Sequence, residues 1–66
     1  MKNRLKFYRH QLQMTQREFA AHINVHYAAY NRWERQHVQP SLDKLYDIWQ
    51  TLKKDFPDIH IEDLLN

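Results

Sequence analysis

The chain has 66 residues, no cysteine, no glycine, and ten Lys or Arg side chains against eight Asp or Glu. A chain of this size forms one domain and buries only about 60% of the surface it exposes when unfolded, which excludes a roomy substrate cavity. The absence of cysteine excludes disulfide scaffolds and thiolate metal sites. No apolar run approaches the ~18 residues of a membrane span, and residues 1–10 lack the apolar stretch of a secretory signal, so we expect a cytoplasmic protein.

The charges are unevenly placed along the chain. Residues 1–39 carry seven Lys or Arg against two Glu, whereas residues 40–66 carry three Lys against six Asp or Glu. A basic half joined to an acidic half indicates an anionic partner for one side of the molecule, and nucleic acid is such a partner. Chance asymmetry in a soluble protein is the alternative interpretation.

Helical spacing of apolar residues dominates the first part of the chain. Leu5, Tyr8 and Leu12 follow one another in steps of three and four, which predicts a helix over residues 2–12. A second helix is predicted over residues 15–23. Its start is a capping box, in which the Thr15 hydroxyl accepts from the amide of Glu18 and the Glu18 carboxylate accepts from the amide of Thr15.

A third helix is predicted over residues 26–35, after a break at Asn24. Asparagine tolerates a left-handed backbone better than most residues, so Asn24 is suited to the turn between the two helices. On the third helix we expect Tyr30 and Trp33 to point inward. Residues 36–40 are predicted to form a loop, and the side chain of Val38 is expected to be buried beneath it.

The last part of the chain predicts one long helix and a final turn. Ser41 is a suitable N-cap, and the helix is expected to end before Pro57, because the residue preceding a proline resists the helical region. A short turn is expected over residues 61–65. The apolar stripe expected on the long helix consists of Leu42, Leu45, Ile48, Trp49 and Leu52. The sequence therefore predicts an all-α fold, a compact bundle of four to five short helices in a single domain over residues 1–66.

The most informative feature is the pair of short helices within residues 15–35, which only about three residues separate. Helices joined so closely must cross at a steep angle, and this is the helix-turn-helix arrangement. A helix fits the major groove of DNA, which is about 12 Å wide. The pair therefore favours binding to double-stranded DNA.

Four short segments carry a resemblance to a known family. They are residues 14–20 (MTQREFA), 23–25 (INV), 31–35 (NRWER) and 39–42 (QPSL). In this order and spacing the chain resembles the lambda-repressor-like, Cro/Xre-type helix-turn-helix proteins. The resemblance extends over nearly the whole chain, and it implies a lambda-repressor-like DNA-binding domain that acts as a sequence-specific transcriptional regulator, here expected to be a repressor.

The resemblance also implies roles for individual residues. Base reading is expected from Tyr27, Ala28, Asn31 and Arg32, and contacts with the DNA backbone from Gln16, Arg17, His26 and Arg35. Arg9 and Glu34 match a family pair that forms a structural ion pair. Small members of the family usually act as symmetric dimers, so we expect a homodimer, with residues 56–65 as the candidate pairing surface.

The chain departs from the family pattern at several positions. Gln13 and Asn24 stand where the family often has glycine, and His26 stands where the N-cap is usually Ser or Thr. Tyr27 and Ala28 replace the polar residues common at the base-reading edge. Alanine meets a thymine methyl but makes no hydrogen bond, so specific reading is expected mainly from Arg32, with Asn31 as a second candidate.

Other functions receive less support from the sequence. His22 and His26 have a metal-like spacing but no third ligand, so we expect no metal or other cofactor. Carboxylate pairs such as Asp43 and Asp47 lie on helical surfaces, and no nucleophile stands beside a base, so we do not expect an enzyme. The alternative function is a protein-interaction module on the same fold, such as an antitoxin that binds a toxin.

Overall fold

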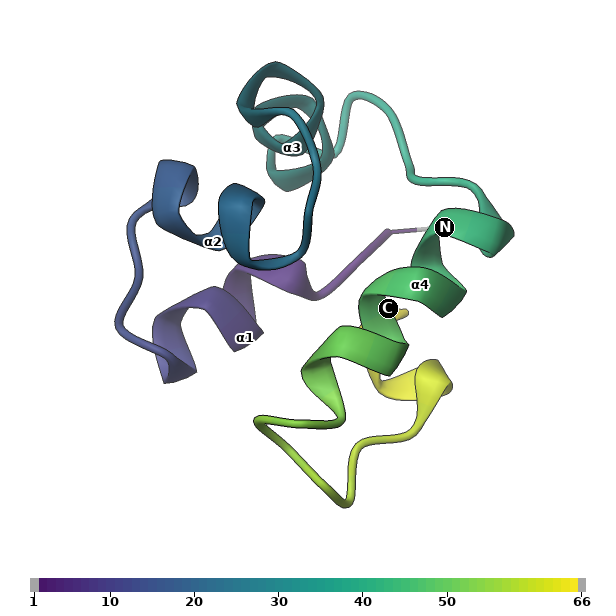
Figure 1. The fold of residues 1–66 in the computed structure, drawn as a ribbon. Coiled ribbons are helices and arrows are strands. Elements are labelled where there is room, and N and C mark those ends of the chain that lie inside the picture. Colours follow the sequence, from purple (N-terminus) through teal and green to yellow (C-terminus); the bar gives the residue numbers. More distant parts are fainter. Residues whose placement is uncertain (1, 66) are drawn as a thin grey trace.

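The computed structural model describes residues 2–65, which form four α-helices followed by one turn of 3₁₀ helix. These elements are α1 (Leu5–Gln11), α2 (Gln16–His22), α3 (Tyr27–Glu34), α4 (Leu42–Leu52) and η1 (Ile61–Leu64). The predicted all-α fold is confirmed. In Figure 1, α1, α2 and α3 gather on one side of the molecule, and α4 with the C-terminal segment forms the other side.

The first helix begins later than the sequence predicted, at Leu5 rather than near residue 2. The reason is Asn3, which is buried and pairs with Leu65 in an isolated antiparallel bridge. Its side-chain Oδ1 accepts from the amide of Leu5 at 3.2 Å, and the amide of Arg4 donates to the carbonyl of Leu64 at 2.9 Å. Residues 3 and 4 are therefore held against the end of the chain, and the helix starts after them.

The second helix begins as the sequence predicted. The Thr15 hydroxyl accepts from the Glu18 amide at 3.1 Å, and the Glu18 carboxylate accepts from the Thr15 amide at 2.8 Å. Both halves of the capping box are thus present. These bonds satisfy two backbone amides that a helix start otherwise leaves without a partner.

The start of the fourth helix and the loop before it confirm one prediction and correct two. Ser41 caps it through a hydrogen bond from the amide of Lys44 at 3.2 Å. Leu42 was expected on the inner stripe but is 69% exposed, because it is the first residue of the helix and the core face starts one turn later at Leu45. Val38 was expected beneath the preceding loop but is 49% exposed, and Pro40 is buried in that loop instead.

One core lies between the two sides of the molecule. Every helix contributes to it, and Tyr30 and Trp33 of α3 point inward as predicted. Trp49 is only half-buried, and its indole N–H donates to the carbonyl of Ile59 at 3.0 Å. The buried apolar side chains are Leu5, Tyr8, Phe19, Ala20, Ile23, Tyr30, Trp33, Leu45, Ile48, Leu52, Ile59 and Leu64.

Residues 56–65 fold back onto their own chain. Ile59 and Leu64 are buried in the core, and Phe56 and Leu65 pack partly buried against it. The prediction that this segment forms a dimer surface rested on its apolar residues. Because those side chains are used within one molecule, that argument for a pairing surface does not hold.

Candidate nucleic-acid interface

The turn between α2 and α3 has a defined backbone geometry. Asn24 has a φ of 61°, in the left-handed region. The amide of Asn24 donates to the carbonyl of Ala21 at 3.1 Å, and the amide of Val25 donates to the carbonyl of Ala20 at 2.9 Å. These two bonds form a Schellman motif, which ends α2 and redirects the chain at once into α3.

The two helices are locked together by packing and by a side-chain bond. The rings of Phe19 and Tyr30 lie 5.4 Å apart between centroids, and both side chains are fully buried. At the edge of this contact, Asn31 Nδ2 donates to Gln16 Oε1 at 3.0 Å. The orientation of α3 is therefore fixed relative to α2.

A buried ion pair joins these helices to α1. Arg9 Nε donates to Glu34 Oε2 at 2.8 Å, and Arg9 Nη2 donates to Glu34 Oε1 at 2.9 Å. Arg9 also donates to the carbonyl of Met14 at 3.0 Å, and Gln16 Nε2 donates to Glu34 Oε1 at 2.9 Å. The bidentate geometry makes this a strong contact, and it leaves little of the charge of Arg9 for a ligand.

The environment of Glu34 favours its ionised form. Burial by itself raises the pKa of this carboxyl group, but the hydrogen bonds from Arg9 and Gln16 outweigh burial and hold the pKa below its ordinary value. Burial raises the pKa of the Tyr30 hydroxyl far above its ordinary value. That hydroxyl lies beside the ion pair but has no partner in hydrogen-bonding geometry among the described residues.

The outward face of α3 carries a cationic stripe. Ala28, Arg32 and Arg35 are exposed, and their spacing of four and three places them on one face of the helix. Tyr27 and Asn31 are half-buried on the neighbouring face, which turns toward α2. The four residues predicted to read bases therefore divide into an open pair, Ala28 and Arg32, and a pair that also contacts α2.

Arg17 lies against Tyr27, one member of the second pair. Its guanidinium carbon stands 4.2 Å from the centroid of the Tyr27 ring, which is a cation–π contact between α2 and α3. Sequence reasoning missed this contact, because Arg17 and Tyr27 become neighbours only when the two helices cross.

His26 is exposed at the start of α3. It occupies the N-cap position, but its side chain accepts no hydrogen bond from the helix. Together with Ala21, Asn24 and Val25 it lines a hollow of about 270 Å³ beside the turn. The imidazole therefore remains available at the surface that α3 presents.

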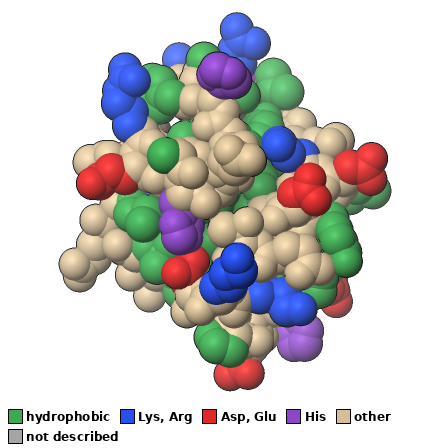
Figure 2. Space-filling view, in the orientation of Figure 1, with side chains coloured by type: hydrophobic (Ala, Val, Ile, Leu, Met, Phe, Trp, Pro, Cys, Tyr) green, Lys and Arg blue, Asp and Glu red, His purple; other side chains and the backbone are tan. Residues whose placement is uncertain are grey.

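The end of the molecule that contains α3 is basic. Figure 2 shows Lys and Arg side chains standing out there, together with a histidine and without an Asp or Glu among them. Elsewhere on the same face acidic side chains stand among Lys and Arg side chains. On this face the end that contains α3 is therefore basic, whereas the rest carries charges of both signs.

A polar cluster that the sequence analysis missed fixes the end of α3. Asn3 Nδ2 donates to the carbonyl of Trp33 and to Gln39 Oε1, each at 2.9 Å. Gln36 Nε2 donates to the carbonyl of Asn3 at 3.1 Å. Asn3 lies 30 to 36 positions before these partners in the sequence, so no local pattern predicts the contact.

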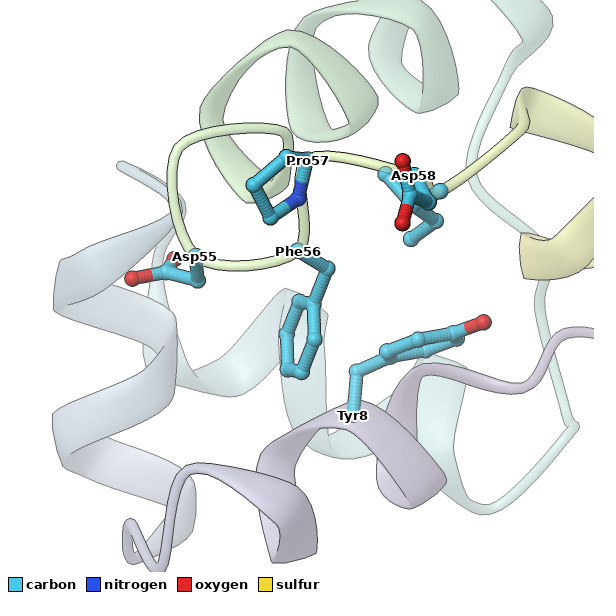
Figure 3. Close-up of a pocket in the computed structure, with 6 residues that line it drawn as sticks. Tyr8, Asp55, Phe56, Pro57 and Asp58 are labelled. Atoms are coloured by element: carbon cyan, nitrogen blue, oxygen red, sulfur yellow. The ribbon is translucent and has the colours of Figure 1, made fainter.

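A hollow of about 330 Å³ lies at the opposite end from α3, between α1 and the turn after α4. Figure 3 shows the Phe56 ring reaching from this turn toward α1, next to Tyr8, with Pro57 and Asp58 above. The rings of Tyr8 and Phe56 meet edge to face at 5.2 Å, and Asp55 at the rim is already bonded to His22 at 2.7 Å. The hollow therefore follows from the packing of the turn on α1.

Two further structural findings concern residues 2–65. No group of three or more His, Asp or Glu side chains within this range is arranged to hold a metal ion, and His22 bonds to Asp55 rather than meeting His26. Within the same range, no helix has the length and apolar character needed to traverse a bilayer.

The closely joined α2–α3 pair, its Schellman turn and the exposed cationic face of α3 define a helix-turn-helix protein of the DNA-binding, regulatory class. Comparison with models of protein families matches residues 5–59 to the family described as helix-turn-helix. The chain belongs to this family, whose members are of the Cro/Xre type. Neither the search of curated proteins nor the search of solved structures found a match.

Proposed function

We propose that this chain is a sequence-specific, double-stranded DNA-binding repressor that inserts α3 into the major groove. The observation that carries the proposal is the stripe of Ala28, Arg32 and Arg35, which stays exposed on α3. That helix is bonded to α1, to α2 and to the N-terminal segment. Repression follows from the binding itself, because a protein bound across a promoter blocks access to it.

Each exposed residue has a distinct role in this proposal. Arg32 reads a base through its guanidinium fork, since arginine pairs with the O6 and N7 acceptors of guanine. Ala28 leaves room for a thymine methyl group, and Asn31 keeps part of its amide for a base next to these. Arg35 and His26 meet backbone phosphates at the two ends of α3.

Gln16 has mainly a bracing role in the proposed complex. Its Oε1 accepts from Asn31 and its Nε2 donates to Glu34, which leaves one Nε2 hydrogen for a phosphate. Arg9 is architectural, because Glu34 already holds its guanidinium.

We also propose that two copies bind one operator. A single module of this size buries about 600–1,000 Å² on DNA, which supports only weak binding. Two copies related by twofold symmetry would read half-sites about 34 Å apart. Selection of bound sites from a random DNA pool tests this, and a selected motif without twofold symmetry would contradict it.

The first prediction concerns Arg32. Arg32→Ala should weaken binding to the selected site by about 1–3 kcal/mol and relax the preference at one base pair, because the guanidinium fork is lost. Titration of the selected duplex and its single-base variants measures both effects. Lys54→Ala is the matched control, since Lys54 is an exposed cation on the turn after α4, away from α3.

If Arg32→Ala discriminates between base pairs as the unsubstituted protein does, Arg32 does not read a base.

A broader test is a mobility shift with random duplex at low and at moderate salt, because phosphate contacts make binding salt-sensitive. Retardation that weakens with salt supports the proposal. No retardation at either salt would favour a protein-interaction module, such as an antitoxin.

A further inference from the structure

The stacked pair of Arg17 and Tyr27 has a geometry that a simple phosphate contact does not need. The guanidinium lies over the Tyr27 ring at 4.2 Å, while Arg17 itself is exposed. Among the described residues Arg17 takes part in no side-chain hydrogen bond and no ion pair. Its five N–H donors are therefore unused, but the guanidinium that carries them is held against a ring.

The ring that holds Arg17 is itself anchored. Tyr27 is the first residue of α3 and packs partly buried against the core. The preceding residue of α2, Gln16, is bonded to Asn31, one turn further along the same face of α3. The start of α2 thus runs along the flank of α3, and Arg17 stands beside the end of α3 that carries Ala28.

The chemistry of a stacked guanidinium favours base reading over phosphate binding. A phosphate is satisfied by a point charge in many orientations, whereas the two parallel N–H donors of a guanidinium match the O6 and N7 acceptors of guanine in one plane. A guanidinium that lies over an aromatic ring uses one face for that contact and keeps its N–H donors for a ligand. Because the ring restrains the side chain before DNA arrives, less conformational entropy is lost on binding.

We propose that Arg17 and Tyr27 act as one reading unit, in which Tyr27 is a positioning residue and Arg17 reads a guanine beside the base pairs met by Ala28 and Arg32. This inference rests on the proposed DNA-binding function and extends it. It changes two expectations from the sequence, since Arg17 moves from the backbone contacts to the base contacts and Tyr27 moves from reading to positioning.

Arg17→Lys is the decisive variant, because it keeps the positive charge and removes the planar fork. It should lower the affinity for the selected site about 5- to 150-fold, the range expected for one lost bidentate base contact. The loss should vanish on a duplex in which that one G·C pair is replaced. The slope of affinity against salt concentration should stay as in the unsubstituted protein, because the number of phosphate contacts is unchanged.

Two substitutions at Tyr27 test the positioning role. Tyr27→Phe keeps the ring and should retain full discrimination. Tyr27→Leu keeps apolar bulk against the core but removes the ring, so it should lose discrimination at the same base pair as Arg17→Lys. Binding of each variant to random duplex shows that the fold is retained.

Three outcomes would overturn the inference. If Arg17→Lys binds every duplex as the unsubstituted protein does, the planar fork of Arg17 reads no base. If Tyr27→Leu retains the discrimination that Arg17→Lys loses, Tyr27 does not position Arg17 and the two residues do not act as one unit. A loss that maps to an A·T pair contradicts the guanine assignment. Failure of the unsubstituted protein to select any site is a different result, because it contradicts the proposed function itself.

Discussion

At the scale of single residues, Glu34 connects three helices. It lies on α3, accepts two bonds from Arg9 of α1 and a third from Gln16 of α2. The side chains of Arg9 and Glu34 are only 13% and 5% exposed, so water screens the pair weakly. Loss of either partner leaves a buried charge unpaired, which is the costly way to break such a pair.

The pH dependence of stability should report on this carboxylate. The folded pKa of Glu34 lies below its unfolded value, so its contribution is fully present above the unfolded pKa and is lost as pH falls through the folded pKa. Glu34→Gln should lower the free energy of unfolding by about 2 kcal/mol at neutral pH. The difference from the unsubstituted protein should shrink below a pH of about 4.

Urea unfolding of both proteins at a series of pH values measures this difference. Glu18→Gln is a useful comparison, since Glu18 is an exposed carboxylate in the capping box. A cost of Glu34→Gln that stays constant down to strongly acidic pH would contradict the assigned role.

At the scale of elements, three helices end in the same way without glycine. Gln13, Asn24 and Gln36 follow α1, α2 and α3 with φ values of 57°, 61° and 63°. In each case the amide pair after the helix bonds back to the last turn, which is the Schellman pattern. A left-handed backbone costs a residue with a Cβ roughly 1–2 kcal/mol, so the bonds and packing around each turn must offset that strain.

Glycine substitutions should separate strain from side-chain function. Gln13 is exposed, so Gln13→Gly should raise the free energy of unfolding by about 0.5–1 kcal/mol through relief of backbone strain. Gln36→Gly relieves the same strain but removes the bonds to Asn3 and Gln39, so it should destabilise the protein. Thermal unfolding of both variants provides the measurement, and an equal gain for both would show that the Gln36 bonds contribute nothing.

At the scale of the whole molecule, the two ends of the chain close the fold together. The amide of Arg4 bonds to the carbonyl of Leu64, and Asn3 pairs with Leu65 while its side chain bonds to the end of α3. Leu64 is fully buried among side chains from the rest of the core. The support behind α3 therefore depends on residues at both ends of the described chain.

Leu64→Ala should accordingly lower the stability of the fold strongly. Removal of a fully buried leucine side chain costs about 2–5 kcal/mol. A domain of this size has a total stability of only about 3–10 kcal/mol, so the variant should be partly or wholly unfolded. Leu42→Ala is the matched control, because the same change at a side chain that is 69% exposed should alter stability by less than about 0.5 kcal/mol. Circular dichroism and urea unfolding measure both.

Local patterns in the sequence determined the helices and the turn of this protein. The capping box at Thr15, the N-cap at Ser41 and the break at Asn24 each depend on residues within about one helical turn. Such bonds form between near neighbours whatever the rest of the chain does. The same holds for the closeness of α2 and α3, which follows from the short turn between them.

Only the tertiary structure decided which side chains meet across the fold. The polar cluster of Asn3, Gln36 and Gln39 spans more than 30 residues, and the stack of Arg17 on Tyr27 depends on the angle at which two helices cross. It also decided that Leu42 faces solvent while Leu64 fills the core. Periodicity gives the face of a helix on which a residue lies, but the packed neighbours decide whether that face is covered, and they come from distant parts of the chain.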